Sequence, residues 1–399
     1  MSSGVYAQQQ QNETVQVQPP QQQQQQQQNY KCFESREDLK YAILGDFRNP
    51  NSRLSQEYGY PIGTWCVDRV TDFSGDPMED GYLFDEDPNF NEPLDGWNTS
   101  SVTDMSGMFY GLHSFNQPLF FDTSKVQNMN LMFYKASSFN QPLSNFDTSS
   151  VTMMASMFYK ASSFNQPLDS FDTSKVKSMI GMFNEASAFN QPLDSFDTSK
   201  VESMVAMFEA ASSFNQPLSL NASNLKDMED MFKGASSFNE PLTLYDSSRV
   251  TNMFGMFDGA SSFNQPLSSF DTSSVTGMSN MFMNAASFDQ PLDSFDISSV
   301  TIMLNMFHGA SSFRQSLCPL FLDHSGSVIT IDMFQKTSCP VKDNPSLSVP
   351  LHKTSFCQPC QSLCYDQNYT CSAGSSIWSL GTLMVLAVST CVSIYFWGA

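Results

Sequence analysis

FNQPLSSFDTSSVTGMSNMFMNAAS, residues 263–287, is one copy of a unit that fills most of this chain. A fixed spacing of 24 or 25 residues separates successive copies. Such a period is typical of a solenoid, in which each unit contacts mainly its neighbours. The sequence therefore predicts one elongated repeat body. Its copies begin at Phe90, Phe115, Phe139, Phe164, Phe189, Phe214, Phe238, Phe263 and Phe288, and a degenerate copy begins at Phe313.

Each copy has two halves with different patterns. In residues 275–285, apolar residues recur at steps 0, 3, 6, 7 and 10, as on one face of a short helix. The preceding residues 271–274, Asp-Thr-Ser-Ser, supply side chains that can cap a helix N-terminus. Residues 263–270 are short and aromatic and contain a proline, which favours a short strand at an edge. We therefore expect an α/β repeat solenoid with one short strand and one short helix per turn.

Composition divides the chain into five parts. The N-terminal tail contains an eight-glutamine run and too little apolar surface to fold, so we expect it to be disordered. A cap follows, because residues 65–73, WCVDRVTDF, echo residues 97–105, WNTSSVTDM, of the first full copy. The parts are a disordered Gln-rich tail, an N-terminal cap with a degenerate repeat, the repeat solenoid, a Cys-rich C-terminal cap or stalk, and an apolar segment, at residues 1–30, 31–89, 90–317, 318–374 and 377–397.

Two segments bear on targeting. Residues 377–397 hold 21 residues without a charge, enough to cross a bilayer as a helix. The alternatives are a GPI-attachment signal, with small residues around 372–376, and a buried soluble helix. Residues 1–30 contain no apolar signal-peptide core. Because Val5-Tyr6-Ala7 has the small residues of a cleavage site, we hypothesise that Met1 lies inside a longer signal peptide.

None of the nine cysteines lies inside the regular copies, and one, Cys391, lies in the apolar segment. An even number at the two ends of the array favours disulfides in an oxidising compartment. Reduced cysteines in a cytosolic protein are the alternative, and Cys357, Cys360 and Cys364 also have a spacing that zinc accepts, although no histidine lies at ligand spacing. The disulfide candidates are Cys32, Cys66, Cys318, Cys339, Cys357, Cys360, Cys364 and Cys371. Glycosylation sequons, at Asn12, Asn98, Asn221 and Asn368, fit an extracellular location.

The charge of the chain excludes some partners. Asp and Glu number 40 against 19 Lys and Arg, for a net charge of −21. Such a chain repels phosphate backbones, so we expect no nucleic-acid binding. The four histidines are scattered, and no H-E-x-x-H, G-x-S-x-G or P-loop motif is present. We therefore expect that the chain is not an enzyme.

Three sets of polar residues are candidate sites. Asp85, Asp87, Asn89 and Asn91 offer alternating oxygen ligands that suit calcium, within an acidic loop that could also be merely solvated. An asparagine after the first Phe of most copies could line a binding face, although we expect these amides to bond to backbone at each turn. An aspartate recurs before Thr-Ser and could bind cations in a row, although capping explains it better. These aspartates are Asp122, Asp147, Asp172, Asp197, Asp246, Asp271 and Asp296.

The unit FNQPLxxFDTSxVxxMxxMFxxASS resembles the BspA-like leucine-rich-repeat surface proteins, over about residues 70–334. The resemblance implies a leucine-rich-repeat-type solenoid with a parallel strand per turn, a surface role in adhesion or recognition, and no catalytic residues. Phe and Met stand here where ordinary leucine-rich repeats use Leu.

The function we expect is that of a membrane-anchored extracellular repeat protein on the cell surface. It would bind a protein or glycan ligand in adhesion or recognition, without catalysis and with no cofactor other than calcium. The alternative is a structural cell-wall or matrix component that organises cations through its acidic surface.

Overall fold

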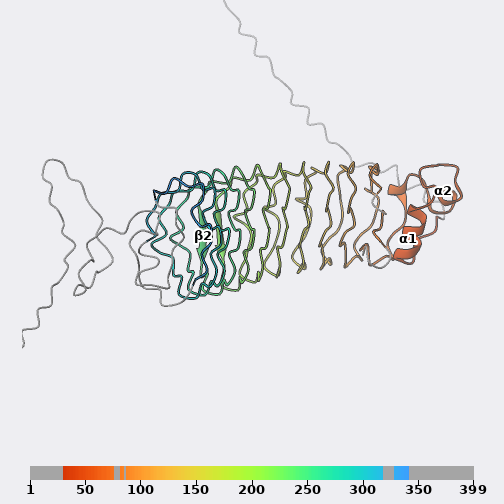
Figure 1. The fold of residues 1–399 in the computed structure, drawn as a ribbon. Coiled ribbons are helices and arrows are strands. Elements are labelled where there is room, and N and C mark those ends of the chain that lie inside the picture. Colours follow the sequence, from red (N-terminus) through yellow and green to blue (C-terminus); the bar gives the residue numbers. More distant parts are fainter. Residues whose placement is uncertain (1–29, 76–80, 85–86, 318–327, 341–399) are drawn as a thin grey trace, which may run out of the picture.

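The computed structural model describes residues 30–75, 81–84, 87–317 and 328–340. Figure 1 shows a long body in which the chain winds through successive turns stacked side by side. Parallel bridges join residues one copy apart, as from Asp104 to Asn128 and from Asn128 to Met153. One copy of the sequence unit therefore makes one turn of the stack.

The N-terminal end of the body carries the described helices, α1 (Arg36–Ile43) and α2 (Arg53–Tyr58), and a short 3₁₀ turn, η2 (Ile62–Thr64). The Ser35 side chain caps α1 by accepting a hydrogen bond from the backbone N–H of Asp38. A disulfide between Cys32 and Cys66 ties the start of this region to its end. The helices thus cover the first turn of the stack, the arrangement predicted for a cap.

The helix expected in each copy is absent from the described copies, where residues 275–285 and their equivalents form successive turns. The reason is backbone conformation, because Asn280 and Asn284 have φ of 59° and 56° and lie in the left-handed region. Alternate backbone N–H groups therefore donate hydrogen bonds to the next copy instead of to their own. The N–H of Met278 donates to the carbonyl of Ile302, and that of Phe282 donates to the carbonyl of Met306. Turns of this kind bring every third or fourth side chain inward, which imitates helical spacing.

Strands are also fewer than expected. The described strands are β1 (Leu218–Asn221) and β2 (Leu242–Tyr245), which pair in parallel with Leu218 opposite Leu242. They lie in the predicted half of their copies, and Leu218, Leu220, Leu242 and Leu244 point into the core. In the other described copies, single parallel bridges occur in the half that was expected to be helical. The expectation of one strand and one helix in every turn is therefore wrong in detail.

Stacked phenylalanine rings fill the core. The Phe183 ring lies 5.7 Å from Phe158 in the preceding copy and 5.6 Å from Phe208 in the next, nearly parallel to both. Phe183 also stacks at 4.0 Å on Phe189, which opens the following copy. The Val, Met and Ala residues of the unit are buried around these rings. Each buried aromatic contributes about 1.5–3 kcal/mol, and every turn repeats the contribution.

Candidate functional site

The asparagine that follows the first Phe of a copy forms hydrogen bonds with the next copy. The backbone N–H of Asn190 donates to Oδ1 of Asn165, at 2.9 Å, and Nε2 of Gln191 donates to the same oxygen. The pattern recurs at Asn116, Asn140, Asn165, Asn215, Asn239 and Asn264. The prediction that these amides bond to backbone at each turn is confirmed. Their oxygens are consequently engaged in hydrogen bonds between copies.

A second ladder uses the Asp-Thr pair. The Thr148 hydroxyl donates to the carbonyl of Asp172 and accepts from its backbone N–H, at 3.1 and 2.8 Å. The Asp172 carboxylate accepts from the N–H of Ser174, 2.9 Å away. Hydrogen bonds from the hydroxyl and the N–H of Ser174 lower the pKa of Asp172. The aspartates therefore cap, as predicted, but they cap a turn instead of a helix.

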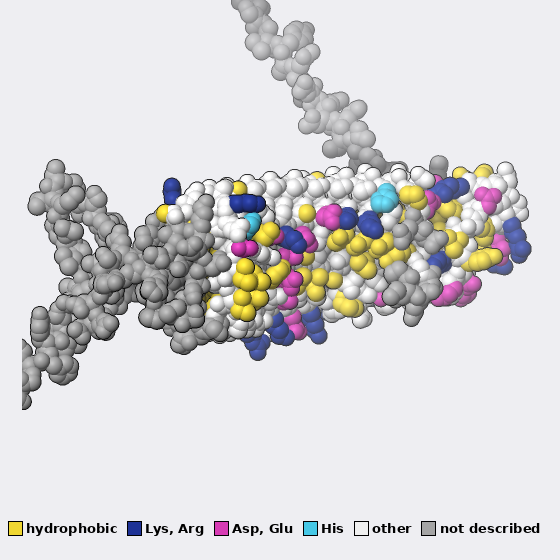
Figure 2. Space-filling view, in the orientation of Figure 1, with side chains coloured by type: hydrophobic (Ala, Val, Ile, Leu, Met, Phe, Trp, Pro, Cys, Tyr) yellow, Lys and Arg dark blue, Asp and Glu magenta, His cyan; other side chains and the backbone are white. Residues whose placement is uncertain are grey.

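Side chains vary on the opposite half of each copy, at the pair of residues between Met-Phe and Ala. We call these residues the variable pair. Figure 2 shows hydrophobic and charged side chains gathered along one face of the body, below a band of polar side chains and backbone. The same half of the copies exposes Met153, Ile180 and Phe254. The variable pairs are Tyr110-Gly111, Tyr134-Lys135, Tyr159-Lys160, Asn184-Glu185, Glu209-Ala210, Lys233-Gly234, Asp258-Gly259, Met283-Asn284 and His308-Gly309.

The first variable pairs form a column of stacked tyrosines. Tyr82 stacks on Tyr110 with ring centres 3.8 Å apart, and Tyr134 lies 4.5 Å from Tyr110 and 4.4 Å from Tyr159. Because each ring face covers the next, the column presents ring edges to its surroundings. The pKa of Tyr159 is raised, mainly by its partial burial and by the neighbouring Tyr134.

Lysines flank this column. The ammonium of Lys135 lies 5.8 Å from the ring centre of Tyr110 and 5.4 Å from that of Tyr134. The ammonium of Lys160 lies 5.3 Å from the Tyr159 ring and 3.0 Å from the Glu185 carboxylate. These distances place both cations in the range of cation–π attraction. We call the tyrosines and the two lysines the tyrosine–lysine column.

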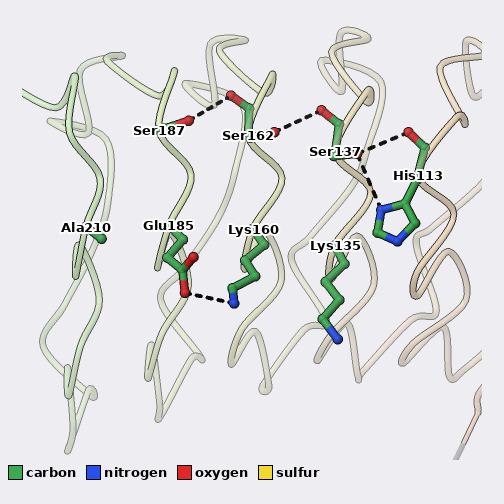
Figure 3. A pocket seen from close by; sticks show the side chains of 8 residues that line it. All are labelled: His113, Lys135, Ser137, Lys160, Ser162, Glu185, Ser187 and Ala210. Atoms are coloured by element: carbon green, nitrogen blue, oxygen red, sulfur yellow. Dashed lines mark hydrogen bonds and ion pairs between the residues drawn. The ribbon is translucent and has the colours of Figure 1, made fainter.

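A groove of about 550 Å³ runs beside the column (Figure 3). Lys135, Lys160 and Glu185 form one row along it, and the other row consists of His113, Ser137, Ser162 and Ser187. The Ser162 hydroxyl donates to the carbonyl of Ser137 at 3.3 Å, and Ser187 repeats this contact with Ser162. A serine oxygen bonded in this way still has lone pairs that can accept a hydrogen bond.

The later variable pairs have a different chemistry. Lys233 lies between two carboxylates, 2.8 Å from Asp230 and 3.3 Å from Glu209. Burial raises the pKa of Asp258, and Nδ2 of Asn284 donates to its carboxylate at 3.3 Å. The face is therefore aromatic and basic in the early copies, whereas in the later ones the carboxylates Glu209, Asp230 and Asp258 outnumber the single lysine, Lys233.

A protein-family model described as "Mycoplasma protein of unknown function, DUF285" matches residues 53–120, 119–220, 143–244 and 219–320. Together the matches span residues 53–320, about two thirds of the chain. The chain belongs to this DUF285 family. The overlapping matches follow the internal repetition, so the DUF285 region is a repeat region. No curated protein and no solved structure matches the chain.

The calcium set of this DUF285 chain is only partly described, because Asp85 lies outside the described residues. Asp87 pairs with Arg48 at 2.7 Å and accepts from the N–H of Asn89 at 3.0 Å. Burial acts to raise the pKa of Asp87, but these hydrogen bonds lower it overall. The Asn91 oxygen accepts from Asn116. In the described ranges no group of three His, Cys, Asp or Glu residues could hold a metal, and calcium binding stays a prediction.

The cysteines and sequons are likewise described in part. Cys32 and Cys66 form a disulfide, and Cys339 is disulfide-bonded as well. Asn98 and Asn221 are exposed, so both can accept a glycan. The other candidates lie outside the described residues, namely Asn12, Asn368, Cys318, Cys357, Cys360, Cys364 and Cys371.

The terminal segments of the DUF285 chain also fall outside the described part, including residues 1–29 and the apolar segment 377–397. Among the residues that the structure does describe, no helix has the length and apolar character needed to cross a membrane. The predicted anchor therefore stays a prediction.

Sequence reasoning missed the tyrosine–lysine column and its groove. The signal was present, because the copies agree at Met-Phe and Ala but differ at the two residues between them. Aligning the copies against one another and asking where they differ would have found it.

Proposed function

We propose that this chain is a membrane-anchored extracellular repeat protein of the BspA-like leucine-rich-repeat kind. It acts in adhesion or recognition by binding a protein or glycan ligand, and it is not an enzyme. One observation carries the proposal: a constant scaffold presents a face on which the variable pairs differ from copy to copy. Such a division is typical of repeat proteins that bind through an extended surface.

The ladders support this assignment of roles. Asn165 and Thr148 bond to neighbouring copies, so changing them would disturb the stack. The variable pairs also contact one another between copies, but no single side chain is required there, since the copies tolerate Tyr, Asn, Glu, Lys, Asp, Met and His at the first residue of the pair. Variation that stability does not require is available for recognition.

Several features support an extracellular location. The disulfide between Cys32 and Cys66 is of a kind that persists in oxidising compartments. Exposed sequons at Asn98 and Asn221 and the apolar residues 377–397 agree with it. Protease treatment of intact cells that express the full chain tests this location. Loss of the repeat region to added protease is expected, and full protection until the cells are lysed would contradict it.

Binding is tested with beads that carry the full-length chain on a panel of immobilised glycans and matrix proteins. We expect saturable binding to at least one member, weakened by Tyr134→Ser with Tyr159→Ser and unchanged by Gln127→Ala, which alters an exposed side chain on the same copy as Tyr134. If no member is bound, or if all variants bind equally, the recognition face is misassigned.

A structural role in a wall or matrix is the second candidate. The net charge of −21 favours it, as do the exposed aspartates Asp122, Asp147, Asp172 and Asp197, whose pKa values are lowered by hydrogen bonds from neighbouring serines. They stay ionised in mildly acidic surroundings and can attract cations. This role predicts that the chain stays in the insoluble wall fraction until a chelator releases it, and extraction by detergent alone would count against it.

A further inference from the structure

We infer that the groove beside the tyrosine–lysine column binds a linear anionic polysaccharide, whose carboxylates contact Lys135 and Lys160. The inference rests on the proposed recognition function and names a ligand class and a site for it. Four observations lead to it: the backbone conformation of the charged residues, the charge of the groove, its spacing, and its boundary.

The backbone conformation at the charged residues of the groove does not itself require a charged side chain. Lys135, Lys160 and Glu185 have φ of 58°, 56° and 54°, in the left-handed region. Four other copies place glycine at this position, as at Gly111 and Gly234, where φ is also positive. A side chain in this conformation costs about 1–3 kcal/mol relative to a relaxed one. Ala210 and Asn284 adopt the same conformation at this position, with φ of 55° and 56°, so the conformation belongs to the fold. The fold accepts small and uncharged residues here, and it does not require the charges of Lys135, Lys160 and Glu185.

The charge of the groove favours an anion. Glu185 is the one carboxylate among the residues that line it, and Lys160 neutralises that carboxylate at 3.0 Å. Lys135 rests on the rings of Tyr110 and Tyr134, and among the described residues no carboxylate pairs with it. The groove thus keeps a positive charge in a chain whose net charge is −21. A ligand carboxylate can pair with Lys135 without competing against a protein group.

The spacing favours a polymer whose units match the copies. Parallel neighbouring strands lie about 4.8 Å apart, and the ring centres of Tyr110, Tyr134 and Tyr159 follow at 4.5 and 4.4 Å. The cations and the serine hydroxyls of the groove recur with the same period, one copy apart. An extended peptide advances about 3.3 Å per residue and falls out of register with them. A linear polysaccharide whose sugars are close in length to the strand spacing keeps register with the copies. In a β-1,4-linked chain successive sugars are turned over, so every second sugar presents its carboxylate to the row of cations.

The boundary of the groove limits where the anionic chain can lie. Beyond Ala210, which ends the groove, the face carries Glu209, Asp230 and Asp258. Lys233 pairs with Glu209 and Asp230, at 3.3 and 2.8 Å. One cation among three carboxylates leaves a net negative charge that repels an anion, so the ligand covers the copies from Lys135 to Ala210 and stops there. The two halves of one face therefore select a short stretch of a long polymer.

The test measures binding of the full-length chain by calorimetry to three probes: a hexamer of β-1,4-linked mannuronate, the uncharged mannose hexamer of the same linkage, and a glutamate hexapeptide. The two sugars differ in the carboxylate alone. We expect the mannuronate hexamer to bind at least about tenfold more tightly than either of the others, and more weakly as salt is raised. Equal affinity for the mannose hexamer would overturn the role of charge, and tighter binding of the peptide would overturn the ligand class.

Variants locate the site. Lys135→Gln with Lys160→Gln should weaken mannuronate binding about tenfold or more, because two charge-assisted contacts are lost. The matched control is Lys175→Gln with Lys200→Gln, which removes the same charge from two exposed lysines one copy apart outside the groove and should change affinity less than about twofold. Glu185→Gln frees Lys160 and should strengthen binding a few-fold. An equal loss in the control, or no gain in Glu185→Gln, would overturn the site.

Failure of this inference can be told apart from failure of the proposed function. If the groove variant keeps the wild-type affinity for the adhesion panel and no variant or wild-type chain binds mannuronate, the polysaccharide site is wrong and recognition stands. If the wild-type chain binds neither the panel nor mannuronate, both are wrong. An unfolding midpoint measured for each variant shows whether a loss of binding follows from a loss of fold.

Discussion

The asparagine ladder and the tyrosine–lysine column run along the same body. The residues of the ladder are nearly constant from copy to copy, whereas those at the positions of the column vary. Asn165 bonds to the next copy through its side chain, and its equivalents are asparagine in nearly every copy. Tyr159 contacts other variable pairs, and its equivalents change along the stack from tyrosine to Asn, Glu, Lys, Asp, Met and His. Side chains that join copies are fixed by their neighbours, whereas side chains of the face are free to follow a ligand.

The largest effect should come from the core that both sides share. Phe183→Ala removes a ring stacked on Phe158, Phe189 and Phe208 and should lower the free energy of unfolding by about 3–5 kcal/mol. Ile180→Ala, on the exposed half of the same copy, should cost less than about 0.5 kcal/mol. Urea unfolding followed by circular dichroism measures both, and similar costs would mean that the core is misplaced.

The asparagine ladder should give the next effect. Asn165→Ala removes the oxygen that accepts from the N–H of Asn190 and from the amide of Gln191. An unpaired N–H inside the stack costs about 1–3 kcal/mol. Gln127→Ala is the matched amide change at an exposed position. A loss confined to Asn165→Ala would support the ladder, and equal losses would show that its hydrogen bonds do not stabilise the stack.

The hydroxyl ladder should contribute less. Thr173 is buried and donates to the carbonyl of Asp197 at 3.0 Å. Thr173→Val keeps the shape of the side chain and removes the hydroxyl, so we expect a loss of about 1 kcal/mol. Thermal unfolding is the measurement. An unchanged or raised midpoint would mean that the methyl group, through packing, is what matters at this position.

The smallest effects should appear in the pH dependence of stability, with opposite signs for Asp172 in the hydroxyl ladder and Asp258 on the variable face. The pKa of Asp172 is lowered by hydrogen bonds from Ser174, so its stabilising effect is present above the unfolded pKa of about 3.9 and is lost as the pH falls through the folded value. The pKa of Asp258 is raised by burial, so its effect favours the fold below about pH 3.9 and is lost as the pH rises through the folded value.

Melting curves between about pH 2.5 and 7 test both signs. Asp172→Asn keeps an acceptor for the N–H of Ser174 and should lessen the loss of stability in acid. Asp258→Asn should raise the midpoint near neutral pH, where the buried carboxylate is charged. A larger loss of stability in acid for Asp172→Asn, or a lower midpoint near neutral pH for Asp258→Asn, would contradict the assignment of these groups.

Much of the scaffold was predictable because it depends on residues that recur. The period predicted one turn per copy, and the amides after Phe predicted the ladder. The helix in each copy was not predictable from apolar spacing, because left-handed residues such as Asn280 make turns with the same three- and four-residue spacing. The conformation of Lys135 is signalled by the glycine that other copies, such as those of Gly111 and Gly234, place at the same position.

The groove was harder to foresee because it depends on what differs between copies. Tyr110, Tyr134 and Tyr159 are separated by 24 and 25 residues and meet only when the copies stack. Their role becomes visible once the stacking places Lys135 over two rings that come from different copies.

One paired measurement tests the central claim that the face recognises and the ladders stabilise. The variant Lys135→Gln with Lys160→Gln is compared with the wild-type chain in mannuronate affinity and in unfolding midpoint. The account predicts an affinity lower by about tenfold or more and an unchanged midpoint. An unchanged affinity, or a midpoint that falls together with affinity, would contradict it.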